Sequence, residues 1–283
     1  MRIGIYPNVK KQAALPILRT VVEFLQPKVD QLLIPEEAAR EMGFHQYAVK
    51  RDTIPPRISL ALTLGGDGTL LSVAKETAAA GVPVCGINLG HLGFLTHIEV
   101  AQLVQGLEKL VTGSYLIEER LMLDSFIRRE DRLITLPPAL NDVVVTKGGF
   151  ARLIRLNLFV AGQLTESYPA DGLIVSTPTG STGYSLSAGG PIISPQLNVM
   201  VITPICPHSL NARPLIVSAE EEVHITLQTN HDDVALTVDG QRVYSLLPDD
   251  TVELKRSPHK ALLVRFPDSG FYQTLHAKLR RDE

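Results

Sequence analysis

The fold is decided at residues 58–80, ISLALTLGGDGTLLSVAKETAAA. Residues 58–64 are mostly apolar and predict a buried strand, and residues 69–80 predict a helix. Between them stands Gly65-Gly66-Asp67-Gly68, whose glycines let the backbone adopt unusual dihedral angles and approach a ligand closely. A strand that turns into a helix through such a loop is typical of an α/β domain with a parallel sheet.

The same alternation of strand and helix extends over the amino-terminal third of the chain. Residues 2–6 and 82–87 predict strands, and residues 15–25 and 99–110 carry apolar side chains at helical spacing. Parallel strands joined by such helices form a sheet that is covered on both faces. We therefore expect residues 1–120 to belong to an α/β domain.

The pattern changes near residue 121 from helical spacing to alternation with period two. Alternating apolar and polar residues predict antiparallel strands at 152–160, 223–227, 234–238 and 252–254. A single amphipathic helix is predicted at 272–279, and we expect it to bury its apolar side on the first domain. The predicted organisation is an α/β domain of residues 1–120 plus 265–283 and a β-rich domain of residues 121–264.

The composition excludes several classes of protein. The 283 residues carry 27 Lys and Arg against 30 Asp and Glu, so the net charge of −3 offers no basic field for nucleic acid or an anionic membrane. There is no signal-peptide layout and no apolar run of roughly 18 residues, so we expect a cytoplasmic protein. Cys85 and Cys206 are too few for a zinc cluster or a disulfide framework, and we expect both to be reduced and buried.

Asp67 is the unusual residue of the glycine loop. The N–H groups that open the following helix form an anion site suited to phosphates, beside which a carboxylate is costly. The carboxylate is explained if it holds a metal ion or takes a proton from an attacking hydroxyl. The loop is neither a dinucleotide fingerprint, because Leu71 stands where a third glycine is needed, nor a Walker A loop. The alternative is a tight turn with a solvated aspartate.

A second polar cluster occupies residues 176–185, STPTGSTGYS. Its hydroxyls suit ribose and phosphate oxygens, and Tyr184 suits a base or ring. Two alternatives stay open: an elaborate Ser/Thr turn, and a serine hydrolase that uses Ser181 outside a Gly-x-Ser-x-Gly motif. Asn141 and Asp142 precede another apolar segment, and an amide beside a carboxylate there suits either a ribose diol or a turn.

Several motifs together resemble the bacterial NAD kinase family, in the order of that family. They are residues 65–69 (GGDGT), 90–95 (GHLGFL), 141–142, 171–191, 203–208 with 213–214, and 239–241. The resemblance implies phosphorylation of the adenosine 2′-hydroxyl of NAD by ATP or polyphosphate, which gives NADP, with Mg²⁺ as cofactor. It also implies a Rossmann-like, phosphofructokinase-like α/β domain completed by the carboxy-terminal helix, a β-rich NAD-binding domain, and assembly as a dimer or tetramer.

The resemblance also implies roles for individual residues. Asp67 matches the family's proposed general base, and Asp171 matches an aspartate that can reach the neighbouring subunit's site in family tetramers. The implied phosphate pocket and substrate contacts are Gly66, Gly68, Thr69, Phe94 near the adenine, Asn141, Asp142, Thr182, Gly183, Tyr184 and Gln241. The Asp-Gly pair that precedes Gln241 also favours a hairpin turn.

Two positions depart from the family pattern. Asp142 is one methylene shorter than the usual glutamate, which puts its reach to a ribose in question. Pro169 replaces an arginine that has been linked in the family to the choice of NAD over NADH. Because proline has no charge to offer, we expect weaker discrimination between these two acceptors.

The charge on the transferred phosphates must be neutralised. No P-loop lysine is visible in the sequence, so helix amides and Mg²⁺ would do this work. No set of metal-ligating side chains is predicted, and His91, His97 and His208 are expected to form structural hydrogen bonds. Two further hypotheses stay open: a lipid or sugar kinase with a similar glycine loop, and a sensor that binds NADP without turnover.

Overall fold

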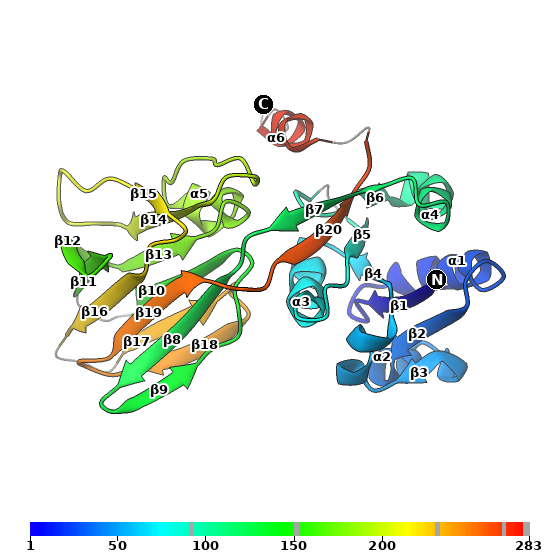
Figure 1. Ribbon diagram of the computed structural model, residues 1–283, viewed down its shortest axis with the longest axis horizontal. Helices are drawn as coiled ribbons and strands as arrows, with labels where there is room; N and C mark the ends of the chain where they lie inside the picture. Colours follow the sequence, from blue (N-terminus) through cyan, green and yellow to red (C-terminus); the bar gives the residue numbers. More distant parts are fainter. Residues whose placement is uncertain (91–92, 150–152, 230–232, 268–269, 280–283) are drawn as a thin grey trace. The chain divides into compact units, whose positions relative to one another are not determined.

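The computed structural model describes residues 1–90, 93–149, 153–229, 233–267 and 270–279. The chain forms two units (Figure 1): one holds residues 1–119 and the segment from residue 260 onward, and the other holds residues 120–259. The return to the first unit begins at 260, ahead of the expected 265, because strand β20 (Ala261–Arg265) pairs within the sheet of the first unit.

The sheet of the first unit follows the order β3-β2-β1-β4-β5-β20-β7, with β6 paired to β5. Neighbouring strands from β3 to β20 are parallel, which confirms the predicted sheet type. The other bounds are β1 (Arg2–Pro7), β2 (Gln31–Pro35), β3 (Ala48–Val49), β4 (Leu60–Gly65), β5 (Val84–Asn88), β6 (Ile98–Glu99) and β7 (Leu116–Arg120). Every residue of β4 and β5 is buried, as expected for strands covered on both faces.

Helices cover both faces of this sheet. Ile3 and Ile5 belong to a core that includes side chains of α1 (Ala14–Leu25), α2 (Glu36–Glu41) and α4 (Leu103–Val111). Helix α3 (Asp67–Ala78) packs against β4, β5 and β20, and Figure 1 shows α1 and α3 on opposite sides of β1 and β4. Short 3₁₀ turns lie at η1 (His45–Tyr47), η2 (Arg51–Thr53), η3 (Pro55–Arg57) and η4 (Val100–Gln102).

Two predicted helices begin at other residues than expected. Helix α3 starts at Asp67 instead of residue 69, because the carbonyl of Gly66 already accepts the first helical hydrogen bonds, from the N–H groups of Thr69 and Leu70. Helix α4 starts at Leu103 instead of residue 99, because Glu99 ends β6 and η4 intervenes.

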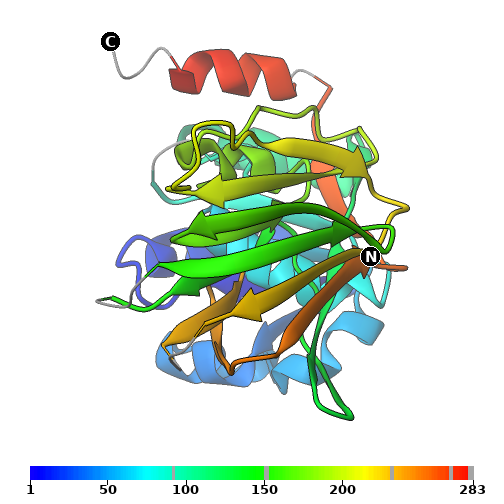
Figure 2. The ribbon, with the colours of Figure 1, turned by 90° about the vertical axis from the view of Figure 1, so that its left-hand side faces the viewer.

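In the part of the chain that the structure describes, the second unit is built from two antiparallel sheets (Figure 2), as the period-two pattern predicts. Their orders are β15-β14-β13-β10-β17-β18 and β12-β11-β16-β19-β8-β9. Alternate residues of both sheets share one core, in which Val143 and Val145 of one sheet join Leu156 and Leu158 of the other.

The bounds of these strands and of the short helices beside them are as follows. They are β8 (Leu123–Arg129), β9 (Arg132–Thr135), β10 (Asp142–Lys147), β11 (Ile154–Val160), β12 (Gln163–Ala170), β13 (Gly172–Ser176), η5 (Gly180–Thr182), α5 (Tyr184–Ser187), β14 (Val199–Ile205), β15 (Leu215–Ser218), β16 (Val223–Gln228), β17 (Val234–Val238), β18 (Arg242–Leu246) and β19 (Thr251–Arg256).

Two predictions about burial are wrong. The carboxy-terminal helix, α6 (Phe271–Leu279), has no buried side chain among residues 271–278, and Tyr272 is 70% exposed. The rings of Phe271 and Tyr272 contact each other with centroids 5.3 Å apart. Cys206 is exposed because it follows β14 in a turn, where its own φ is +45°.

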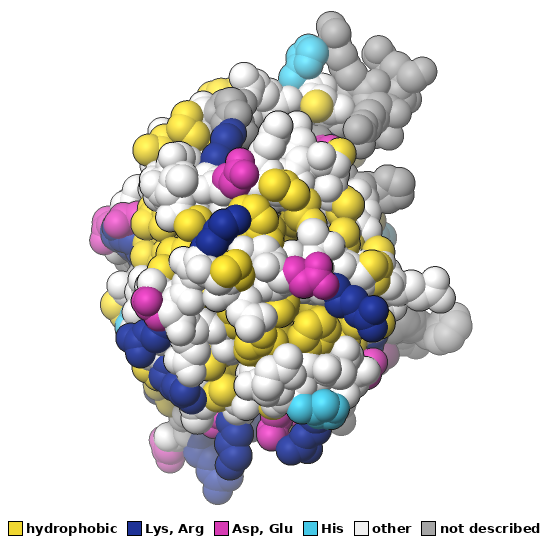
Figure 3. Space-filling view, turned by 90° about the vertical axis from the view of Figure 1, so that its right-hand side faces the viewer, with side chains coloured by type: hydrophobic (Ala, Val, Ile, Leu, Met, Phe, Trp, Pro, Cys, Tyr) yellow, Lys and Arg dark blue, Asp and Glu magenta, His cyan; other side chains and the backbone are white. Residues whose placement is uncertain are grey.

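The surface carries charges of both signs. On the face shown in Figure 3, Lys and Arg side chains are interspersed with Asp and Glu, as the small net charge leads one to expect. None of the described helices combines the length and the apolar character that a membrane crossing requires.

Candidate active site

The strand order of the first unit reverses direction between β1 and β4. From β1 the chain proceeds through α1 to β2 on one side, and from β4 it proceeds through α3 to β5 on the other. The carboxyl ends of β1 and β4 lie side by side, since Pro7 pairs with Leu64 and the Asn8 N–H donates to the Leu64 carbonyl at 2.8 Å. Ligands of open parallel sheets bind at the carboxyl ends of strands where the order reverses.

The glycine loop joins β4 to α3 at this point of the sheet. A Cβ on Gly65 would collide with the side chain of Thr69, so the turn requires glycine there. Within the described residues, no side chain caps the start of α3, and the N–H groups of Thr69 and Leu70 donate to the Gly66 carbonyl, so the positive end of the helix dipole lies at this loop. Gly68 has open space where a Cβ would stand. The helix start is therefore shaped to receive an anionic group.

Asp67 is held by a second segment of the first unit. Its Oδ2 accepts the Phe94 N–H at 2.7 Å, and its Oδ1 accepts the Leu95 N–H and the Thr96 hydroxyl, both at 3.3 Å. Gly93 must be glycine, because a Cβ there would overlap the Asp67 carboxylate. The alternative of a merely solvated aspartate is therefore wrong: the carboxylate is half-buried and fixed in position.

Asn8 and Lys11 complete the loop, and neither was predicted from the sequence. Asn8 Nδ2 donates to Thr69 Oγ1 at 3.3 Å and so orients the last residue of the glycine motif. The Lys11 amine lies 3.6 Å from the position of a Cβ on Gly66 and 3.4 Å from that of a Cβ on Gly90. The sequence shows a Pro-Asn turn after the first strand. Whether that turn lies near Gly66 depends on the order of the strands in the sheet, which the sequence does not show.

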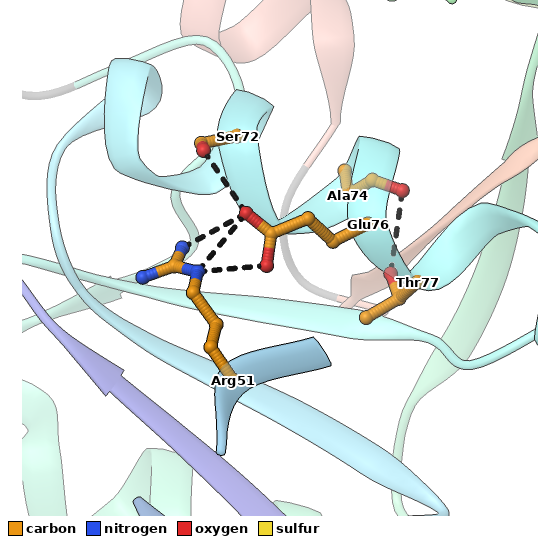
Figure 4. Close-up of polar contacts among 5 residues, drawn as sticks. All are labelled: Arg51, Ser72, Ala74, Glu76 and Thr77. Carbon is orange, nitrogen blue, oxygen red and sulfur yellow. Dashed lines mark hydrogen bonds and ion pairs between the residues drawn. The ribbon is translucent and has the colours of Figure 1, made fainter. Parts of the chain in front are cut away.

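Helix α3 is fastened at its far end by charge. In Figure 4 the guanidinium of Arg51, from η2, meets the carboxylate of Glu76, with Arg51 Nε 2.9 Å from Glu76 Oε2 and Nη2 3.0 Å from Oε1. Ser72, one turn earlier on α3, lies 3.4 Å from the same carboxylate. This ion pair links η2 to α3, the helix whose first turn faces the site.

Phe94 has a cationic neighbour. The Lys278 amine of α6 lies 4.3 Å from the centre of the Phe94 ring, within the range of a cation–π contact. The ring is half-buried. The backbone N–H of Phe94 holds Asp67, so this residue serves the loop independently of its predicted place near an adenine.

In the second unit, one carboxylate organises the Asn141-Asp142 pair. Asp239 accepts backbone N–H groups of Leu140 at 3.1 Å, Asn141 at 2.8 Å and Asp142 at 3.0 Å. It stands at the β17–β18 hairpin turn with φ +51°, and its own N–H donates to the Asp142 carbonyl at 2.9 Å. The sequence favoured this Asp-Gly pair as a turn, which is confirmed, but gave no sign of the second role.

Most hydroxyls of residues 176–185 hold the segment itself. Thr177 Oγ1 donates to the Leu140 carbonyl at 2.6 Å and accepts the Gly180 N–H at 3.1 Å. Ser181 is fully buried between the Pro178 carbonyl, at 2.6 Å, and the Ile193 N–H, at 3.0 Å. Ser185 and Thr203 share a hydrogen bond of 2.9 Å. The Ser/Thr-turn alternative is thus correct for these residues, and a buried, doubly bonded Ser181 is unsuited to nucleophilic attack.

Three predicted contacts of this segment remain accessible. Thr182 and Gly183 are half-exposed, and Tyr184 is 46% exposed. A Cβ on Gly183 would lie 3.7 Å from Asn141 Nδ2 and 3.8 Å from Asp142 Oδ2, so this glycine faces the Asn-Asp pair. The structure therefore brings these predicted residues together at one end of two inner strands of the sheet, where β10 begins and β13 ends.

Of the remaining predicted residues of the second unit, Asp142 and Gln241 lie near this end of the strands and Asp171 lies at the other end. Asp142 is 6% exposed, so its shorter side chain is buried at the start of β10. Gln241 is exposed in the hairpin turn beside Asp239. Asp171 instead forms an ion pair with Lys147, with Nζ 2.9 Å from Oδ1, at the opposite end of the β10–β13 pair.

Candidate metal ligands are few. Among the described residues, no group of three His, Cys, Asp or Glu side chains is placed to hold a metal ion. His97 is half-buried in the first unit, and the His208 N–H donates to the Pro169 carbonyl at 2.7 Å. His91 lies outside the described residues.

A glycine loop at a strand-order switch, with a carboxylate fixed beside a helix start, is typical of a phosphotransferase of the kinase class. Comparisons with known proteins make the class specific. Residues 3–115 match the model for the ATP-NAD kinase N-terminal domain, and residues 140–266 match that for the ATP-NAD kinase C-terminal domain. The chain belongs to the NAD kinase family.

Relatives and solved structures agree. The chain is 45% identical to an NAD kinase of Moorella thermoacetica over 99% of this chain and 89% of that protein. It is 44% identical to an NAD kinase of Natranaerobius thermophilus over 98% and 97%. A yeast NADH kinase in complex with NADH superposes with a TM-score of 0.87 at 25% identity, over 99% of this chain and 87% of that one. An NAD kinase from Archaeoglobus fulgidus in complex with ATP gives 0.76 at 25% identity, over 99% of both chains.

Proposed function

We infer that the protein transfers the terminal phosphoryl group of ATP or polyphosphate to the adenosine 2′-hydroxyl of NAD, which yields NADP. The observation that carries this proposal is the Asp67 carboxylate, fixed by three hydrogen bonds beside the start of α3. A pure NADP sensor has no chemical need for a carboxylate held beside phosphates. The relatives named above support the acceptor, and the complex of the Archaeoglobus protein supports ATP as one donor.

The residues of this chain divide the reaction between them. The N–H groups at the start of α3 bind donor phosphates, which need alignment and charge neutralisation more than covalent help. Asp67 Oδ2 accepts one hydrogen bond in the protein, and a carboxylate oxygen has about two acceptor directions, so Oδ2 can also take the 2′-hydroxyl proton. Asn141 and Asp142 bind ribose hydroxyls, and Thr182, Gly183 and Tyr184 contact the dinucleotide.

Mg²⁺ fits as an ion carried by the donor. Because the described residues offer no cluster of three ligands, donor phosphates would supply most of its coordination, and Asp67 is the carboxylate at the loop that could face it. When bound, the ion neutralises charge on the transferred phosphates. Loss of NADP formation on addition of a chelator, and its recovery with excess Mg²⁺, would test this.

The deciding experiment is a kinase assay with purified protein, Mg²⁺, NAD and either ATP or polyphosphate, in which an NADP-specific dehydrogenase reports the product. NADP formed with either donor supports the proposal and ranks the donors. If neither donor gives NADP while NAD or NADP raises the melting temperature, the sensor hypothesis replaces it. A lipid or sugar acceptor phosphorylated in place of NAD would support the hypothesis of a lipid or sugar kinase.

The acceptor preference is tested in the same assay. Pro169 lies on the edge strand β12, opposite Arg155 of β11, and offers no charge. We expect the ratio of the kcat/KM values for NAD and NADH to be closer to one than in family members with arginine at this position. An NAD-to-NADH preference as strong as that of an arginine-bearing relative, measured side by side, would contradict this expectation.

The predicted dimer or tetramer and the cytoplasmic location stay predictions.

A further inference from the structure

Lys11 places a positive charge over both glycine segments of the first unit. Its amine lies within 3.6 Å of the Cβ position of Gly66, at the start of α3, and within 3.4 Å of that of Gly90, after β5. These are the nearest heavy atoms that a side chain at either glycine would meet. Both positions therefore leave the space that the lysine amine occupies.

The backbone around Lys11 is fixed in a turn. The Lys11 N–H donates to the Asn8 carbonyl at 3.0 Å, and the Lys11 carbonyl accepts the Ala14 N–H at 2.9 Å, where α1 begins. Asn8 is in turn bonded to Leu64 and to Thr69 of the glycine motif. The lysine is therefore tied to the carboxyl ends of β1 and β4, where the strand order reverses.

The amine would offset negative charge at the loop. Asp67 brings a negative charge to a place where phosphates must also lie, and the helix start offers the equivalent of about half a positive charge. The Lys11 side chain is half-buried, and the structure gives its amine no acidic partner among the residues it describes. A lysine amine in this setting is a compact, mobile cation suited to a phosphate.

We propose that Lys11 binds the terminal phosphates of the phosphoryl donor and performs for this loop the task of the lysine that the glycine motif lacks. The inference rests on the proposed kinase function. ATP and polyphosphate share the chemistry that Lys11 recognises, so it contributes to binding of both. Lys11 would then neutralise phosphate charge together with the helix amides and Mg²⁺, and it comes from the turn between β1 and α1.

The test compares Lys11→Met and Lys11→Arg with Lys10→Met. Lys10 is exposed in the same turn, so its replacement controls for the loss of one charge near the loop. We expect Lys11→Met to lower kcat/KM for ATP and for polyphosphate by about 10- to 100-fold, the range for a charged hydrogen bond, with KM for NAD within about twofold. Lys11→Arg should recover part of the loss, and Lys10→Met should match the wild type.

The outcomes separate this inference from the proposed function. Wild-type protein that forms no NADP overturns the function itself. Wild-type activity together with a Lys11→Met variant within twofold of it in donor kcat/KM overturns the role of Lys11 and leaves the function standing. A rise in KM for NAD with an unchanged KM for both donors would also overturn it, because Lys11 would then meet the dinucleotide. Unchanged melting temperatures establish that the variants are folded.

Discussion

The glycine loop at residues 65–69 and the hydroxyl-rich segment at 176–185 look alike in sequence, since both combine glycine with Thr or Ser. Their structures differ. In the first, Gly66 and Gly68 leave space around the start of a helix, and the flanking polar groups come from distant segments. In the second, Thr177, Ser181 and Ser185 spend their hydroxyls on hydrogen bonds within the same unit.

The difference separates groups that face a ligand from groups that shape the backbone. A buried hydroxyl must find a partner, and a segment that folds as a chain of tight turns supplies carbonyl and N–H partners nearby. A helix start at the end of a parallel strand instead presents the positive end of the helix dipole to an outside partner. Polar composition alone therefore overstates the number of ligand contacts in the second segment.

The largest expected effect is at Asp67. Asp67→Asn removes the carboxylate that can accept the hydroxyl proton, so kcat should fall by about 10²–10⁴-fold while NAD binding changes little. The measurement is steady-state NADP formation together with NAD titration of the melting temperature. Asp52→Asn, at an exposed position of the same unit, is the control and should keep full activity. Normal turnover of Asp67→Asn would refute the assignment.

A substitution at Asp239 tests the support of the Asn141-Asp142 turn in the second unit. Asp239→Asn replaces a carboxylate that accepts three N–H groups with an amide that repels at least one of them, so unfolding free energy should fall by about 2 kcal/mol. KM for NAD should rise at least tenfold, because the Asn141-Asp142 turn loses its support. Asp249 also has a positive φ of 66° but is exposed, so Asp249→Asn should change neither quantity. An unchanged KM for NAD in Asp239→Asn would show that the turn holds by itself.

Ser181 separates structure from catalysis within the hydroxyl segment. Ser181→Ala leaves the Ile193 N–H without its acceptor in a buried position, so stability should fall by about 1–3 kcal/mol. kcat/KM for both substrates should stay within about twofold. Chemical denaturation and the kinase assay measure these two quantities, and Ser187→Ala, at an exposed residue of α5, should affect neither. Loss of activity in Ser181→Ala without loss of stability would revive a catalytic serine.

The smallest effect concerns the two thiols, one in each unit. Cys85 is completely buried on β5, and burial raises the pKa of its thiol to about 12. Below that pH the folded protein keeps this thiol neutral, so it should resist a thiolate-specific reagent, whereas the exposed Cys206 should react. A colorimetric thiol count at pH 8 should give one reactive group in the native protein and two in denaturant. Two in the native state would indicate that β5 opens readily.

Sequence patterns predicted the arrangement of this chain for a physical reason. Strand and helix periods reflect which side chains a local segment must bury, so the α/β unit, the antiparallel unit and most element positions follow from spacing alone. Helix α6 was correctly predicted, but the prediction that it buries its apolar side was wrong. The spacing of apolar residues indicates a helix and does not indicate what those residues contact.

The candidate site divides in the same way. Residue types and their order predicted Asp67, its glycines and the Asn141-Asp142 pair, since they carry chemical meaning and resemble a known family. Three sets of contacts became visible in the folded chain alone: Phe94, Leu95 and Thr96 hold Asp67, Asp239 holds Asn141 and Asp142, and the Lys11 amine lies close to Gly66 and Gly90. Those contacts join residues from 27 to 98 positions apart, and strand order, which no local pattern encodes, brings them together.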